Sequence, residues 1–193
     1  MKKGFTIVEV SILLVIFLIV AFLVAPLSLD DTTQAKNISR WRNVQQEFSN
    51  IFFSINSQKD HSLLPFNAVL DDIFASEIKG ETKPYKITFM NGTYPNVTYR
   101  FKDFKTTYSN AVLAIKLFSD VKEDGLHGIL MYDVNGKYRP NTWGKDVFGL
   151  YIYEDKFVPF GKNEPISKQK QDCSRNGTGL FCSNYYLIGG NFD

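Results

Sequence analysis

The sequence is poor in the residues that build most metal, redox and catalytic sites. Its 193 residues include only two cysteines and two histidines, with no CxxC pair. His61 and His127 are predicted to lie in different elements, which argues against a zinc site. A GxSxG nucleophile motif and a GxxxxGK phosphate-binding loop are also absent from the sequence. These absences leave no catalytic constellation, so we expect that the protein is not an enzyme.

Blocks of like charge are missing as well. Lys and Arg total 22 against 20 Asp and Glu, and the net charge is +2. Nucleic-acid-binding proteins usually carry a basic patch or stripe, so we expect no nucleic acid partner. The 17 Phe, 10 Tyr and 2 Trp residues are sufficient for a hydrophobic core, which excludes a disordered composition.

The longest hydrophobic run covers Phe5–Leu27 and reads FTIVEVSILLVIFLIVAFLVAPL. As a helix it would be about 35 Å long, and the bilayer core is about 30 Å thick. Two lysines precede the run and two aspartates follow it, so the positive-inside rule predicts a cytoplasmic N-terminus. The run is longer than the core of a signal peptide, and Pro26 directly follows its one small residue near the end, Ala25. We therefore expect the run to be retained as a membrane-spanning helix.

After Pro26 the pattern becomes amphipathic. Apolar residues recur mostly three and four positions apart, as on one face of a helix, at Ile38, Trp41, Val44, Phe48, Ile51, Phe52 and Ile55. The sequence predicts one long helix from about Phe5 to about Asn56, kinked at Pro26. Its second half is expected to pack against the following domain.

From Tyr85 onwards the apolar period shifts towards two, which is typical of strands. A short helix is predicted over Asn67–Ile78, and strands over Tyr85–Met90, Val97–Phe101, Ala111–Phe118, Gly128–Tyr132, Val147–Tyr153 and Lys156–Pro159. The tail after Gly161 is predicted to be an irregular loop held by the cysteines. Four Asn-Xaa-Ser/Thr tripeptides, at Asn37, Asn91, Asn96 and Asn176, fit the acceptor pattern of N-glycosylation, and we expect these matches to be chance.

Cys173 and Cys182 lie nine positions apart near the C-terminus. The predicted orientation places them on the oxidising side of the membrane, which favours a disulfide over two unpaired thiols. Closing so short a loop would stabilise the fold by about 2–3 kcal/mol.

The N-terminal residues Lys2–Val10, KKGFTIVEV, resemble the class III leader of type IV pilins and type II secretion pseudopilins. The family pattern is a short basic leader that ends in Gly, followed by Phe, with Glu as the fifth residue after the Gly. Pro26 falls where many members carry a helix-kinking proline. The resemblance implies that a prepilin peptidase cleaves between Gly4 and Phe5 and methylates the new amine of Phe5.

The same resemblance implies a domain organisation and a fold. It divides the chain into a leader (residues 1–4), a transmembrane and filament-core helix (residues 5–27) and a pilin-like α+β domain (residues 28–193). The expected fold is a long N-terminal helix, with a membrane-spanning first half, packed on a small antiparallel sheet with a disulfide-closed C-terminal loop.

Location and partners also follow from the resemblance. It implies a single-pass protein of the bacterial inner membrane, with a periplasmic or extracellular domain, that later enters a surface filament. The implied partners are prepilin peptidase, other pilin or pseudopilin subunits, an inner-membrane assembly platform and, before assembly, membrane lipid. The apolar run lacks the Gly and Ala often found midway in major pilins, which favours a minor pilin or pseudopilin.

Glu9 is the unexpected residue of the apolar run. A carboxylate at mid-bilayer is disfavoured by about 2.5–3.5 kcal/mol. The resemblance implies that Glu9 pairs with the Phe5 amine of a neighbouring subunit and so fixes the register of assembly. The alternative is a side chain that merely extends to the cytoplasmic interface.

A second candidate site lies between Asp133 and Asp146. Asp133, Asn135, Asn141 and Asp146 carry oxygen atoms suited to a hard cation, and some pseudopilins bind calcium in a comparable loop. However, the 12-residue EF-hand pattern is absent, and Asn-Gly and Pro-Asn also fit an ordinary hairpin turn. Calcium is therefore the only cofactor considered, and the plain turn is its alternative.

Two functions from different classes remain open at this point. The first is a structural subunit, a minor pilin or pseudopilin of a type IV pilus or type II secretion filament. The second is a membrane-tethered or pilus-tip adhesin, whose ligand-binding surface would include the loop Cys173–Cys182. The sequence does not distinguish a pilus from a secretion pseudopilus.

Overall fold

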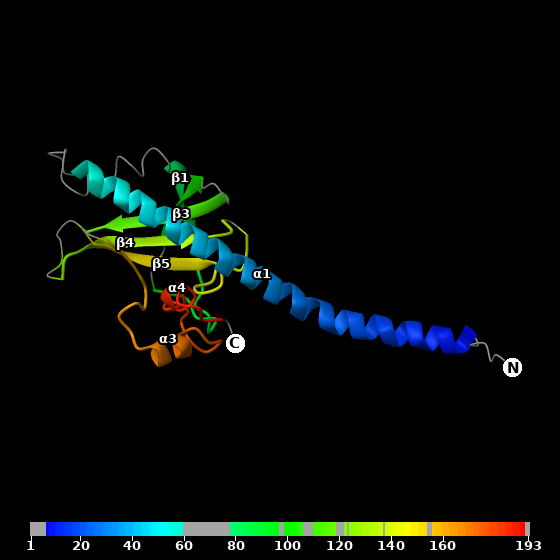
Figure 1. Ribbon diagram of the computed structural model, residues 1–193. Helices are drawn as coiled ribbons and strands as arrows, with labels where there is room; N and C mark the ends of the chain where they lie inside the picture. Colours follow the sequence, from blue (N-terminus) through cyan, green and yellow to red (C-terminus); the bar gives the residue numbers. More distant parts are fainter. Residues whose placement is uncertain are drawn as a thin grey trace. The chain divides into compact units, whose positions relative to one another are not determined.

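A computed structural model describes residues 7–59, 78–96, 99–105, 110–118, 122, 124–136, 138–153 and 156–191. The chain divides into two compact units, Met1–Lys36 and Asn37–Asp193. The fold is α+β, as predicted: a long helix, a small antiparallel sheet and a disulfide near the C-terminus. Figure 1 shows the helices and strands, coloured in the order of the chain.

Helix α1 spans Ile7–Lys59 and comprises 53 residues. Its observed bounds are close to the predicted ones, about Phe5 to about Asn56. The helix continues through Pro26 without a break, and the predicted kink there stays a prediction.

The predicted membrane span requires a correction. Within the part of the chain that the structure describes, no helix is long and apolar enough to cross a membrane. We therefore correct the predicted location: the structure does not support a single-pass inner-membrane protein with a membrane-spanning first half of the helix.

The second unit contains a six-stranded antiparallel sheet in the order β1-β2-β3-β4-β5-β6. Its strands are β1 (Ile78–Tyr85), β2 (Tyr99–Lys105), β3 (Asn110–Leu117), β4 (Leu126–Asp133), β5 (Val147–Tyr153) and β6 (Phe157–Pro159). Each strand pairs with the next one along the chain, so the sheet is a meander built from hairpins. The strand predicted over Val147–Tyr153 is confirmed at both ends.

One sheet face packs against α1, which crosses it in Figure 1. Trp41 is fully buried and stacks on Phe148 of β5 with a centroid distance of 4.8 Å and an interplanar angle of 15°. Phe48, two turns further on, meets Tyr132 of β4 edge to face at 5.7 Å. The wider core of this face comprises Ile38, Trp41, Val44, Phe48, Ala111, Leu130, Tyr132, Val134, Phe148, Leu150, Ile152, Cys173, Cys182 and Tyr186.

The opposite face is covered by loops instead of a helix. Because side chains alternate along a strand, Met131 and Val147 point away from α1 and enter a second cluster. Ile87, Trp143 and Phe160 cover them from the connecting segments. Both faces of the central strands are therefore buried.

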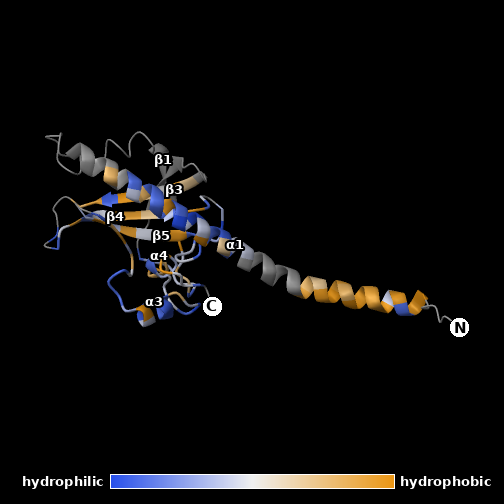
Figure 2. Cartoon of the chain, viewed as in Figure 1, coloured by the Kyte–Doolittle hydropathy of each residue, from blue (hydrophilic) through white to orange (hydrophobic). Residues whose placement is uncertain are grey.

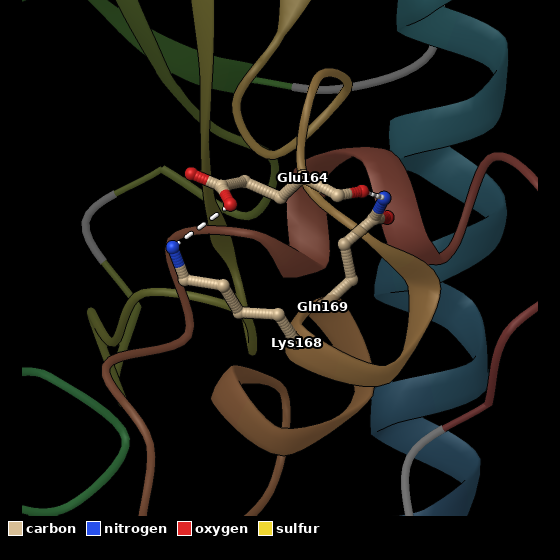
Figure 3. A network of polar contacts seen from close by, with 3 residues as sticks. All are labelled: Glu164, Lys168 and Gln169. Carbon is tan, nitrogen blue, oxygen red and sulfur yellow. Dashed lines mark hydrogen bonds and ion pairs between the residues drawn. The ribbon is translucent and has the colours of Figure 1, made fainter.

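The C-terminal segment contains two short helices, α3 (Ile166–Asp172) and α4 (Cys182–Tyr185), where an irregular loop was predicted. Gln169 of α3 is buried and donates from Nε2 to the Glu164 carbonyl at 2.7 Å, while the Lys168 ammonium pairs with the Glu164 carboxylate at 2.8 Å (Figure 3). Asn184 Nδ2 donates to Gln169 Oε1 at 2.9 Å, which joins α3 to α4.

Two other predictions need correction or fall outside the described residues. The strand predicted over Tyr85–Met90 is wrong, because β1 ends at Tyr85 and Thr88 forms only an isolated bridge with Thr142. Ile87 is buried in the second core cluster although it lies in a loop. Its apolar side chain produced the alternating pattern from which the strand was predicted. The helix predicted over Asn67–Ile78 lies outside the described residues, except for Ile78, which belongs to β1.

Trp41→Phe should destabilise the fold by about 2–4 kcal/mol. The substitution leaves a cavity beside Phe148 and removes the donor that bonds the Ser183 carbonyl at 2.8 Å. Urea unfolding of the whole chain measures this change. The control is Gln46→Ala at an exposed α1 position, which should stay within about 0.5 kcal/mol of the wild type. Equal effects of the two substitutions would contradict the assigned role of Trp41.

Candidate functional site

The first candidate site is the N-terminal apolar surface, which we define as α1 residues Ile7–Leu23. Every residue in this range is exposed, and Figure 2 shows this part of the helix coloured as hydrophobic. Ile7 is 86 % exposed and Phe22 is 84 % exposed. Soluble monomers rarely expose a continuous apolar surface of this extent, and such surfaces commonly mark an interaction site.

Glu9 lies in the first turn of α1 and is exposed. It is the only charged residue between Ile7 and Leu23. A carboxylate suits this position, because the first helical turn presents unpaired N–H groups and the positive end of the helix dipole. The two processing residues of the predicted motif, Gly4 and Phe5, lie outside the described residues.

Ser11 is a second polar residue of the N-terminal apolar surface, and its hydroxyl is hydrogen-bonded within α1. Its hydroxyl donates to the Ile7 carbonyl one turn earlier at 2.9 Å, so the polar group is satisfied within its own helix.

The second candidate site is the connection between β4 and β5. Asp133 is the last residue of β4 and pairs in register with Val147, the first residue of β5. The two ends of the connecting loop are therefore neighbours in the sheet. Asp133 and Asp146 are both fully buried. The structure thus brings together the four residues that the sequence singled out, Asp133, Asn135, Asn141 and Asp146.

The Asp146 carboxylate organises this loop. Its Oδ1 accepts from the Thr142 backbone N–H at 2.6 Å. Its Oδ2 accepts from the Asn141 backbone N–H at 2.8 Å and from Asn135 Nδ2 at 3.1 Å. Asp133 Oδ1 accepts from the Asn135 backbone N–H at 3.1 Å, so both carboxylates hold the same turn.

This arrangement does not suit a cation at Asp146. A calcium ion needs six to eight converging oxygen atoms, whereas the groups that face this carboxylate are N–H donors. Among the described residues, no group of three or more Asp, Glu, His or Cys side chains is placed to hold a metal. The geometry favours the alternative of a plain turn stabilised by Asp146.

Burial raises the pKa of Asp146 from its ordinary value of 3.8 to about 6, although the three N–H donors lower it. Desolvation is the larger effect because the charged form loses its hydration inside the loop. The Asp146 carboxyl therefore titrates in a pH range in which most surface aspartates are already ionised.

The third feature is the segment closed by the cysteines. The predicted disulfide between Cys173 and Cys182 is confirmed, and both residues are buried in the core that contacts α1. Asp172 shapes this loop, and no local sequence pattern indicated that role. Its Oδ1 accepts from the N–H and the hydroxyl of Thr178 at 2.9 and 2.6 Å, and its Oδ2 accepts from the Phe181 N–H at 2.8 Å.

The segment closed by the disulfide packs on two other loops. One follows β1 and contains Met90 and Asn91, and the other is the connection between β4 and β5. Met90 N–H donates to the Thr178 carbonyl at 3.2 Å, and Asn91 N–H donates to the Gly177 carbonyl at 3.0 Å. Gly144 leaves no room for a side chain, since a Cβ there would lie 2.6 Å from the Cys182 sulfur. The three loops therefore form one hydrogen-bonded assembly at the end of the sheet.

The stability of the protein should show the titration of Asp146. Because the folded pKa is raised, the contribution of Asp146 is fully present below about pH 3.8 and is lost as the pH rises through about 6. Relative to Asp146→Asn, which does not titrate, the wild type should lose about 3 kcal/mol of unfolding free energy across this window. Urea unfolding at pH 4, 5, 6 and 7 measures the difference. A difference that stays constant with pH, or that grows, would contradict the raised pKa.

Comparisons with known proteins give no relative for this chain. Neither a family model, nor a curated protein, nor a solved structure matches it. The pilin-like character of residues Lys2–Val10 therefore stays a prediction from the motif.

Proposed function

We propose that this protein is a structural subunit, a minor pilin or pseudopilin, of a filament of the type IV pilus or type II secretion class. The observation that carries the proposal is the N-terminal apolar surface, Ile7–Leu23, with Glu9 as its single charge. The motif Lys2–Val10 supports it, and so does the α+β fold with a helix packed on an antiparallel sheet.

Several neighbouring copies of the same helix would bury the N-terminal apolar surface more completely than a single partner. Its residues are exposed on all sides, so a single flat partner would leave much of the apolar area in water. Burial of apolar area contributes about 25 cal/mol per Å², which favours an arrangement that surrounds the helix. Identical helices in a bundle provide such an arrangement.

Glu9 gives this bundle a register. Cleavage after Gly4 would leave a cationic amine on Phe5, about one helical turn from Glu9. In a bundle, the carboxylate of one copy can pair with the amine of the next. Both groups would be poorly solvated there, so a wrong register would leave a charge unpaired at considerable cost.

The Ile38–Phe48 segment of α1 is already packed against the domain. Ile38, Trp41, Val44 and Phe48 are buried against the sheet, so this part of the helix is not available to other copies. Assembly through the remaining part leaves the fold of the domain unchanged.

Processing is the first consequence to test. Protein isolated from cells that contain the filament system should lack residues 1–4 and carry an N-methylated Phe5. Intact-mass measurement detects both changes, and Gly4→Leu should abolish them. Protein that retains Met1 in such cells would contradict the proposal.

Glu9→Gln should be processed normally but should fail to enter filaments, because the neutral amide cannot neutralise the Phe5 amine. Sheared filaments analysed by immunoblotting measure incorporation. The matched control is Ser11→Ala, which removes a polar group that is satisfied within the helix and should assemble normally. Wild-type incorporation of Glu9→Gln would remove the proposed role of Glu9.

A further inference from the structure

The turn Asn91-Gly92-Thr93 has the features of a modification site. All three residues are exposed. The Asn91 side-chain oxygen accepts from the Thr93 N–H at 3.0 Å and from the Thr93 hydroxyl at 2.7 Å. Gly92 has a φ of +81° with open space around it, so the tip of the turn is accessible. Both bonds go to the oxygen, and within the part of the chain that the structure describes the amide nitrogen of Asn91 makes no hydrogen bond, so it is accessible to a transferase.

The three other Asn-Xaa-Ser/Thr tripeptides differ from this one. Asn37 is only 2 % exposed and lies within α1, where its Nδ2 donates to the Lys145 carbonyl at 3.3 Å. Asn176 is exposed, but its Thr178 is half-buried, and the Thr178 hydroxyl donates at 2.6 Å to Asp172, which lies outside the tripeptide. Thr93, by contrast, is exposed, and its hydroxyl donates to the Asn91 of its own tripeptide. Asn96 is followed by residues 97 and 98, which lie outside the described residues.

In place of the expectation that all four tripeptides are chance, we propose that Asn91 is an acceptor for an N-linked glycan and that the folded structure selects it over Asn37 and Asn176. An oligosaccharyltransferase must reach the amide nitrogen and the Thr hydroxyl of the tripeptide together, and the turn at Asn91 presents both on one exposed surface. The Cys173–Cys182 disulfide is typical of domains that fold in an oxidising compartment, where exported proteins also meet such transferases. The proposal does not rest on filament assembly.

The reaction is a group transfer from a polyprenyl-diphosphate-linked glycan. Asn91 Nδ2 attacks the anomeric carbon, and the new carbon–nitrogen bond forms as the bond between that carbon and the diphosphate oxygen breaks. The diphosphate leaves with the electron pair, and the nitrogen releases one proton. No atom is oxidised or reduced.

The test uses the purified, folded, disulfide-bonded full chain. It is incubated with a single-subunit oligosaccharyltransferase that accepts Asn-Xaa-Thr and with a short polyprenyl-diphosphate oligosaccharide. Intact-mass measurement and peptide mapping should find one glycan per chain, at Asn91. Thr93→Val should abolish the transfer, Thr93→Ser should retain it, and Asn176→Gln should leave it unchanged.

The reduced, denatured chain provides the structural comparison, because it should accept glycans at Asn176 as well as at Asn91. No transfer to Asn91 in the folded chain would overturn the proposal. Equal transfer to Asn176 and Asn91 in the folded chain would contradict the proposal that the bond between Asp172 and Thr178 disfavours Asn176.

Discussion

The packing of Trp41 against Phe148 is the constraint on which the fold of the domain depends. The indole lies flat on the β5 ring, fully buried, and its N–H bonds the Ser183 carbonyl of α4. Arg42 follows at the next position and donates from Nε and Nη2 to the Tyr186 carbonyl at 3.0 and 2.8 Å. Trp41 and Arg42, two adjacent residues of α1, thus bind both the sheet and the C-terminal segment to the helix.

The C-terminal segment can serve as this partner because it is itself held in place. Asp172 fixes the path of the loop through three donors, and the disulfide closes it covalently. The neighbouring connection between β4 and β5 is held in the same way by Asp146. In both loops a single carboxylate, accepting mainly backbone N–H groups, replaces the regular hydrogen bonding of a helix or sheet.

Elements with a strong period were predictable from the sequence, and elements defined by distant partners were not. The amphipathic spacing from Ile38 to Phe48 predicted both the helix and its buried face, and β5 was predicted to the residue because its flanking turns are clear. By contrast, the alternation at Tyr85–Met90 arises from a loop that enters the second core cluster, a contact that no local pattern records. The roles of Asp146 and Asp172 likewise depend on donors several residues away, and the apolar run predicted a membrane span that the structure does not support.

We propose that α1 has two roles: Asn37–Phe48 pack against the domain, and Ile7–Leu23 would be buried between copies in a filament. Cysteine cross-linking of assembled filaments tests it most directly, because both native cysteines are already paired. Under mild oxidation, Leu14→Cys on the N-terminal apolar surface should give disulfide-linked oligomers, and Gln46→Cys on the exposed side of the domain helix should give none. Filaments in which Leu14→Cys cross-links no more than Gln46→Cys would contradict the claim.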